Sequence, residues 1–222
     1  MTPSLCILIP VYNCYDALET LLPHVLSYGI PVCVIDDGST FMPEWIHSQK
    51  VTLINHEMNR GKGAALKTGF VWALQKGFDA VITMDGDAQH HPDDLPGFFA
   101  ACREYDVVVG KRDFSDPRMP RHRKFSNTVT SKMLTRLLHT PILDAQCGYR
   151  CIHTKVLSVL TLETDKYDME NELLIKAARK GFSIGFVPIQ TIYNNSTSHI
   201  HGFRDTWRFL RAIVKYGLQK IK

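Results

Sequence analysis

The chain has 222 residues, of which 45% are hydrophobic, 22% charged and 10% aromatic, so it suits one sizeable α/β domain better than two. These proportions exclude a chain that is disordered over most of its length. The net charge of +4 argues against a dedicated nucleic-acid-binding protein. Between residues 111 and 136, however, eight Lys/Arg accompany only two Asp, and we expect this segment to meet an anionic partner.

The six cysteines are scattered without a CxxC pair, and the amino-terminal segment lacks the basic start and cleavage site of a secretory signal. These features predict reduced thiols in a cytoplasmic protein. The longest uncharged run, residues 181–203, contains nine Ser, Thr, Asn and His residues. We therefore expect no segment to span a membrane.

Apolar runs that end at polar residues alternate with helix-like segments through the first half of the chain. This rhythm predicts a doubly wound, mostly parallel sheet with its site at the carboxyl edge. The expected strands are residues 4–11, 31–35, 51–55 and 80–84, and the expected helices are residues 17–28 and a segment from the glycine-rich stretch 59–63 to about residue 76.

After a strand at residues 106–110 the pattern changes to a basic linker and a less regular order of elements. We therefore divide the single domain into a nucleotide-binding half (1–110), an acceptor half (111–202) and a carboxyl-terminal amphipathic helix (203–222). In the second half we expect helices at 127–139, at 170–179 and from about 205, a short strand at 149–152 and a strand at 185–193.

The strongest chemical signal is the string AVITMDGDAQHHP, in which a hydrophobic strand ends at Asp85 and Asp87. Residues two apart on an extended chain point the same way, so both carboxylates can reach one cation, and Gln89 continues that spacing as a neutral oxygen ligand. Oxygen ligands select Mg²⁺ or Mn²⁺. The alternative is an Asp-rich turn without a metal.

Two further segments fit the binding of a nucleotide. In VIDDGS, the pair Asp36 and Asp37 can accept hydrogen bonds from a base or a ribose, although an Asx turn explains the same letters. In NRGKGAALKTG, glycines before a helix can bring backbone N–H groups to an anion, with Lys62 adding charge. This segment is not an ATPase P-loop, because Leu66 stands where that motif requires glycine. The alternative interpretation is an ordinary capped helix without a bound anion.

Seven motifs occur in an order that resembles family 2 glycosyltransferases, in the branch of dolichyl-phosphate mannose synthase and other polyprenyl-phosphate sugar transferases. They are IPVYN, DDGS, NRGKGAALKTG, MDGDAQHHP, VVVGKR, DAQCGYR and YDMENELLIKAARKG. The resemblance implies a Rossmann-like GT-A fold, a UDP- or GDP-sugar donor and a lipid-phosphate or lipid-like acceptor. One departure is Cys14, where these synthases often carry Glu.

The resemblance also assigns roles to individual residues. It implies that the nucleotide is held by Pro10, Tyr12, Asp36, Asp37, Lys62 and Asp85. It implies that the metal is held by Asp85, Asp87 and Gln89, and that phosphate and acceptor are met by Arg112, Arg123, Gln146 and Arg150.

The expected reaction is transfer with inversion, in which the metal, Arg112 and Lys62 stabilise the leaving diphosphate. A phosphate acceptor is already ionised and needs no strong base, whereas a hydroxyl acceptor does. The candidate bases are Asp168, Glu170 and Glu172, of which we favour Glu170 or Glu172. Favourable charge at a helix start explains the same acids.

Several alternatives are weaker. A haloacid dehalogenase-like phosphatase also carries DxD after a strand, but its motif requires Thr or Val at the position of Gln89. A non-catalytic nucleotide-binding domain would not need to keep the acidic residues Asp85 and Asp87 and the acidic cluster at 167–172. Zinc held by His90, His91, His199 and His201 is disfavoured, because no Cys/His spacing fits. Cys147 is expected to be small and buried rather than nucleophilic.

The carboxyl-terminal helix has a basic stripe beside a Trp-containing apolar face. This pattern fits peripheral attachment to the cytoplasmic face of an anionic membrane, and a solvated helix gives the same periodicity. The stripe comprises Arg204, Arg208, Arg211 and Lys215.

Overall fold

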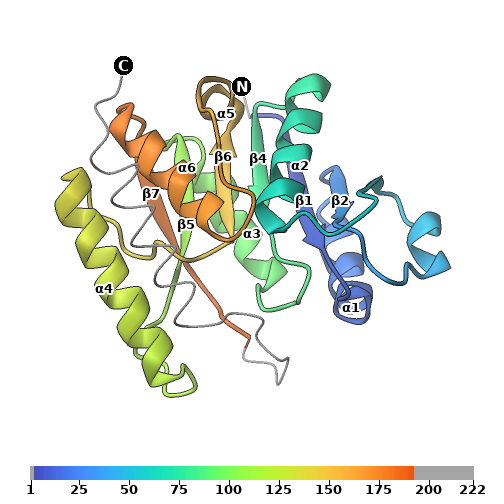
Figure 1. Cartoon of the computed structure of the whole chain (residues 1–222), viewed down its shortest axis with the longest axis horizontal. Helices are drawn as coiled ribbons and strands as arrows, with labels where there is room; N and C mark the ends of the chain where they lie inside the picture. The colour runs from blue at the N-terminus through green and yellow to red at the C-terminus, as the bar shows by residue number, and fades with distance from the viewer. Residues whose placement is uncertain (1–2, 193–222) are drawn as a thin grey trace.

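The computed structural model describes residues 3–192, which form one seven-stranded sheet covered by helices (Figure 1). The strand order is β3-β2-β1-β4-β6-β5-β7, and β6 runs antiparallel to both of its neighbours while the other pairs are parallel. The strands are β1 (Leu5–Val11), β2 (Val32–Asp36), β3 (Thr52–Asn55), β4 (Ala80–Thr83), β5 (Val107–Arg112), β6 (Arg150–His153) and β7 (Ile184–Ile189).

Helices cover the sheet, with α2 and α6 in front of it in Figure 1 and α4 at the outside of the molecule. The α-helices are α1 (Tyr15–Leu26), α2 (Lys62–Lys76), α3 (Leu95–Ala101), α4 (Arg121–Leu138), α5 (Thr154–Val159) and α6 (Asp168–Arg179). Two short 3-10 helices, η1 (Glu44–Ser48) and η2 (Pro92–Asp94), precede β3 and α3. The GT-A arrangement of a mostly parallel sheet flanked by helices is therefore confirmed.

The central strands are buried on both faces, as continuous apolar runs in a parallel sheet require. Every residue of β2 and β4 is buried, and β1 is buried from its second residue onward. The glycine-containing face of α2 packs closely against them, since a Cβ on Gly69 would lie 3.0 Å from the side chains of Leu8 and Ile35. This core fixes the carboxyl ends of β1, β2 and β4 relative to one another.

The structure differs from the expected elements mainly in the second half. Helix α4 begins at Arg121, six residues before the expected start, because Pro120 stands at its N-cap position and ends the preceding loop. The division at residue 110 falls inside β5, and β5 pairs with β6 and β7 rather than with a strand of the first half. The expected helix from residue 205 lies outside the described residues. Within residues 3–192, no helix combines the length and hydrophobicity needed to cross a membrane.

Candidate active site

The loops that follow β1 and β2 are tied together at the carboxyl edge of the sheet. Asn13 has a positive φ of 51°, its backbone N–H donates to Ser39 Oγ (2.9 Å), and its side-chain oxygen accepts from Thr40 N–H (2.8 Å). Asn tolerates this left-handed conformation better than most residues. These hydrogen bonds fix the two loops that are expected to hold a nucleoside relative to each other. Near the end of β1, Pro10 is buried and Tyr12 is exposed.

The two aspartates after β2 have different surroundings. Asp36 accepts the hydroxyl of Ser39 at 2.5 Å. The Asp37 carboxylate is 2% exposed and accepts the backbone N–H groups of Arg60 (3.0 Å) and Gly61 (2.7 Å), with His56 Nδ1 at 2.7 Å. Asp37 therefore orders the glycine-rich loop before α2, and its contact with a nucleoside stays a prediction.

The centre of the site is an ion-pair cluster of Lys62, Asp85 and Glu170, which come from α2, the end of β4 and α6. Lys62 Nζ lies 2.5 Å from Asp85 Oδ1 and 2.8 Å from Glu170 Oε1. Burial alone would lower the pKa of Lys62, but the two carboxylates raise it well above its usual value. Burial likewise opposes ionisation of Asp85, yet Lys62 holds the Asp85 pKa below its ordinary value.

Gly148 lies directly against this cluster. A Cβ at this position would stand 2.7 Å from Lys62 Nζ, 2.9 Å from Glu170 Oε1 and 3.0 Å from Asp85 Oδ1. Thr83 anchors the same loop by donating its hydroxyl to the Gly148 carbonyl (2.7 Å). The QCGYR loop thus needs glycine because three charged side chains meet at its surface.

Asp87 follows in the turn after β4, where its Oδ1 accepts the backbone N–H of Gln89 (3.0 Å). Burial and the neighbouring Asp85 raise the Asp87 pKa to about 6. Asp85, Asp87 and Gln89 offer two carboxylates and an amide oxygen, which are the oxygen ligands that hard cations prefer. A divalent cation would also reduce the repulsion between the two carboxylates. The residues present therefore fit Mg²⁺ or Mn²⁺.

His90 is a buried structural residue at the base of this turn. Its Nδ1 accepts the backbone N–H of Asp85 (3.3 Å), and its ring stacks on Tyr149 at a centroid distance of 5.0 Å. Burial lowers the pKa of His90 to about 4, which keeps the ring neutral. Across residues 3–192 no three His, Cys, Asp or Glu side chains form a metal cluster, and His199 and His201 lie outside that range.

The residues of the second half that were expected to meet phosphate or acceptor lie on β5, on α4 and in the QCGYR loop. Arg112 makes a bidentate pair with the fully buried Asp144, at 2.8 and 2.9 Å. Gln146 donates to Thr130 Oγ1 on α4 (3.3 Å), which ties the QCGYR loop to that helix. Arg123 lies on the same helical face as Thr130, seven residues earlier.

Arg150 has a structural role that corrects its assignment to phosphate or acceptor. Its guanidinium is 2% exposed and donates to the carbonyls of Cys147 (2.8 Å), Glu170 (2.5 Å) and Ala145 (2.8 Å). All three branches of its planar fork are thereby used. Arg150 joins the QCGYR loop to the first turn of α6 and has no surface left for a ligand.

Glu172 is likewise structural, which corrects its assignment as a base. Its carboxylate is fully buried and accepts the backbone N–H groups of Glu163 (2.8 Å) and Thr164 (2.9 Å), with Lys176 Nζ at 2.6 Å. Residues two apart in a helix point to nearly opposite sides, so Glu172 faces away from the side that carries Glu170. Of the favoured pair, only Glu170 meets the site.

Two cysteines close to the site are neutral thiols. Burial raises the pKa of Cys14 to about 11 and that of Cys147 to about 12. Cys147 is 1% exposed, which confirms the expectation of a small buried residue. Cys14 stands near Gly86 in the turn between Asp85 and Asp87, since a Cβ on that glycine would lie 3.4 Å from Cys14 Sγ.

Reasoning from the sequence missed two residues that shape the site. Asp144 carries the bidentate pair with Arg112, and Gly148 makes room for the charged cluster. Both lie inside the DAQCGYR motif, so the motif was visible although these roles were not. Asp168, the third candidate base, is the half-buried first residue of α6.

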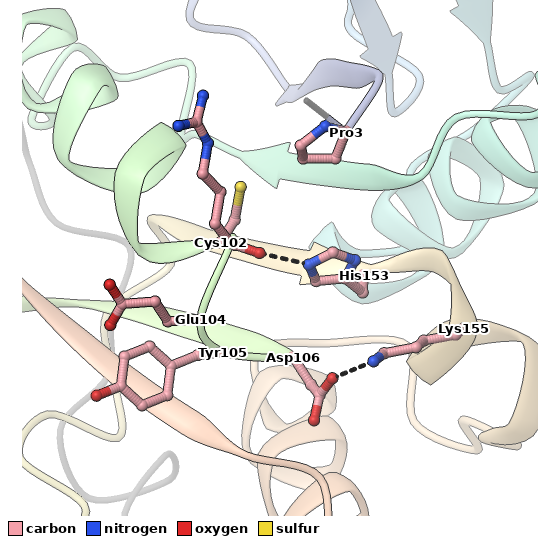
Figure 2. A pocket seen from close by; sticks show the side chains of 8 residues that line it. Pro3, Cys102, Glu104, Tyr105, Asp106, His153 and Lys155 are labelled. Carbon is pink, nitrogen blue, oxygen red and sulfur yellow. Dashed lines mark hydrogen bonds and ion pairs between the residues drawn. The ribbon is translucent and has the colours of Figure 1, made fainter. Parts of the chain in front are cut away.

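A separate cavity of about 300 Å³ lies at the opposite, amino edge of the sheet (Figure 2). Its lining includes Pro3, just before β1, and Asp106, just before β5. Within it His153 Nε2 contacts the Cys102 carbonyl at 2.6 Å, and Lys155 pairs with Asp106 at 2.5 Å. This cavity is not part of the site at the carboxyl edge.

The sequence model of glycosyl transferase family 2 matches residues 6–161, well over half of the chain, and the match includes β1 from its second residue, β2 and the Asp85–Asp87 turn. The chain belongs to glycosyl transferase family 2. It is a glycosyltransferase, and the phosphatase alternative falls with this finding.

Curated relatives match this glycosyltransferase over most of both chains. A Methanococcus voltae protein named UDP-N-acetylglucosamine–dolichyl-phosphate N-acetylglucosaminyltransferase is 30% identical over 95% of this chain and 96% of its own length. The undecaprenyl-phosphate mannosyltransferase of Micrococcus luteus is 29% identical, with 82% and 81% covered. The names of these two relatives contain different sugars, but both names contain a polyprenyl phosphate.

Solved structures show the same fold. Glucosyl-3-phosphoglycerate synthase from Mycobacterium tuberculosis, crystallised with Mn²⁺, UDP and glucosyl-3-phosphoglycerate, superposes with a TM-score of 0.78 at 16% identity, covering 99% of this chain and 82% of that one. The same enzyme has been crystallised with Mg²⁺ and UDP, at a TM-score of 0.74 and 15% identity over 99% of this chain and 81% of that one. At this identity the likeness establishes the fold.

Proposed function

We propose that this glycosyltransferase moves a sugar, with inversion, from a UDP- or GDP-sugar to a polyprenyl phosphate. The observation that carries the proposal is the meeting of Lys62, Asp85 and Glu170 at the carboxyl edge of a family 2 sheet. The names of the two relatives, which share a polyprenyl phosphate and differ in the sugar, support this class of acceptor.

On the donor side, the tied loops after β1 and β2 supply the nucleoside site. The exposed Tyr12 offers an aromatic surface to a base, the buried Pro10 supports the start of the same loop, and Asp36 lies beside them as a hydrogen-bond acceptor. Asp37 contributes by ordering the loop that presents Lys62. Residues 1–110 supply these groups, which is the reason for assigning the nucleotide to this half.

Asp85, Asp87 and Gln89 would hold Mg²⁺ or Mn²⁺ between the protein and the donor diphosphate. The cation supplies electrostatic stabilisation of the negative charge that develops on the leaving diphosphate. Lys62 lies against Oδ1 of Asp85, so the second oxygen of this carboxylate would be the one that meets the cation. Lys62, at the first residue of α2, adds its own charge and that of the helix start.

On the acceptor side, Arg112, Arg123 and Gln146 would meet the phosphate. A phosphomonoester has a second pKa of about 6 and is largely ionised at neutral pH, so its oxygen attacks without a strong base. Glu170, paired with Lys62, then orients that lysine rather than removing a proton. This role suits a phosphate acceptor better than a hydroxyl acceptor.

The test is a transfer assay with the full chain, Mn²⁺ or Mg²⁺, a panel of radiolabelled UDP- and GDP-sugars, and a short polyprenyl phosphate. We expect one donor class to yield a lipid-soluble labelled product, and the matching polyprenol without phosphate to yield none. Product on the polyprenol alone, or nucleotide release without any lipid product, would contradict the proposed acceptor. The donor that gives product decides between uridine and guanosine.

A further inference from the structure

Helix α4 buries polar side chains together with Leu134 on its inner side, and it exposes apolar side chains on its outer side, where a surface helix is ordinarily polar. Asn127, Thr130 and Ser131 are 4–5% exposed on its inner side. Three apolar residues at four-residue spacing, which we call the outer stripe, face solvent. They are Phe125 (72% exposed), Val129 (38%) and Met133 (37%).

Helix α4 is also strongly basic. It carries five Lys/Arg and no acidic residue in its eighteen residues. Helical spacing places Lys132 and Arg136 on the same side as the outer stripe, and Arg121 one turn before Phe125. All three are exposed. The outward surface therefore combines apolar side chains with positive charge.

The helix is placed so that its outward surface is at the periphery. In Figure 1 α4 stands at the outside of the molecule, beyond α6, against which it packs. Its inner side reaches the QCGYR loop through the Thr130–Gln146 hydrogen bond. A surface that contacted the outer stripe would thus lie one helix away from the acceptor side of the site.

We propose that the outer stripe and its basic neighbours bind the surface of an anionic lipid bilayer. Phe, Val and Met would enter the boundary between headgroups and acyl chains, while the Lys and Arg side chains extend to the lipid phosphates. The absence of any acidic residue from α4 favours this occupant over an ordinary protein surface, which mixes both signs of charge. The proposal concerns a face of α4 and does not depend on which acceptor takes the sugar.

The test is flotation of the full chain with vesicles of phosphatidylcholine, with or without phosphatidylglycerol, in the absence of any polyprenyl phosphate. We compare the wild type with a triple variant, Phe125→Ser, Val129→Ser and Met133→Ser. The matched control is Val71→Ser with Leu74→Ser, which removes exposed apolar residues from α2. We expect the stripe variant to lose about tenfold or more in partition into anionic vesicles and the control to bind like the wild type.

A second variant addresses charge. Lys132→Gln with Arg136→Gln keeps the outer stripe, and we expect it to lose about tenfold in binding to anionic vesicles and to show a weaker dependence on salt. Both variants change exposed residues, so circular dichroism and thermal unfolding should match the wild type.

Three results would overturn the proposal. The first is equal vesicle binding by the wild type and the stripe variant. The second is a lowered melting temperature in the stripe variant without vesicle binding by the wild type, which would mean that residues 193–222 of the chain itself cover α4. The third is a dimer that the stripe variant abolishes, which would make a second copy the occupant. Because the vesicles lack acceptor and donor, none of these results depends on the transfer reaction.

Discussion

A single lysine joins carboxylates from two distant parts of the chain. Lys62 contacts Asp85, twenty-three residues later, and Glu170, more than one hundred residues later. Asp87 stands outside this arrangement and carries the pKa raised by burial and by Asp85. The two acids of the turn therefore differ in their contacts, since Asp85 pairs with Lys62 whereas Asp87 accepts the backbone N–H of Gln89, and we expect Asp87 to depend more on a bound cation.

Replacing Asp87 with Asn should abolish metal-dependent transfer while leaving the fold intact. The amide keeps the shape and removes the charge, and we expect a loss of at least about 100-fold in kcat, because electrostatic stabilisation of a leaving group carries effects of this size. Mn²⁺ with UDP or GDP should raise the melting temperature of the wild type but not of the variant. Asp93→Asn, which removes an exposed carboxylate after the same turn, is the control. Full activity in Asp87→Asn would refute the metal assignment.

The two glutamates of α6 should separate stability from catalysis. Glu172→Gln should lower the free energy of unfolding by about 3 kcal/mol, because it leaves buried N–H partners and Lys176 without their charged acceptor. At temperatures where the variant is folded, its kcat should be close to that of the wild type. Glu170→Gln should lower kcat in transfer assays and change the free energy of unfolding in urea less than Glu172→Gln does. Equal losses of kcat in the two variants would contradict these roles.

At the scale of elements, α6 and the QCGYR loop act as one unit. Arg150 at the start of β6 joins them through three carbonyls, and Gly148 lets the loop lie on the charged cluster. Arg150 donates to the backbone carbonyl of Glu170 and thereby helps to fix the first turn of α6. The position of Glu170 therefore depends in part on the buried guanidinium of Arg150.

Arg150→Lys should be destabilising although it keeps the charge. Lysine cannot present three donors in a planar fork, so at least one buried carbonyl would lose its partner, at a cost of about 2 kcal/mol. Urea denaturation measures this loss. Arg123→Lys, a change of the same kind on α4, should leave stability within about 0.5 kcal/mol of the wild type, as surface changes usually do. A stable Arg150→Lys protein would show that the fork is not required.

The sequence allowed the strands of the first half and the positions of Asp85 and Asp87 to be predicted, because apolar runs that end at acids define a parallel sheet and its edge. It did not separate Arg150 from the arginines that are expected to bind phosphate, since arginine is rarely buried. The insertion of β6 between β4 and β5 was also not predictable, because strand order depends on contacts far apart in sequence. The spacing of Glu170 and Glu172, two residues apart on a helix, did indicate that they point to different sides, which their different partners in the structure show.

At the scale of the whole molecule, His90 should contribute to unfolding in acid. Its folded pKa of about 4 lies below the ordinary value of 6.5, so the unfolded chain binds the proton more tightly. The stability from the neutral ring is thus complete above about pH 6.5 and is lost as the pH falls toward 4, by up to about 3 kcal/mol. Urea midpoints of the metal-free wild type and of His90→Gln, compared between pH 7 and pH 4.5, test this. Equal slopes with pH would contradict it.

Strand β5 lies between β6 and β7 and has no hydrogen-bonded neighbour among the strands that precede it. During synthesis, residues 107–112 must therefore wait for some forty more residues before β6 leaves the ribosome, and longer for β7. Until then β4 has an open edge, and the turn that carries Asp85 and Asp87 lacks Gly148 and Glu170. We therefore expect a nascent chain to expose an unpaired apolar strand edge until β6 is available, and to lack the complete ion-pair cluster until Glu170 has been translated.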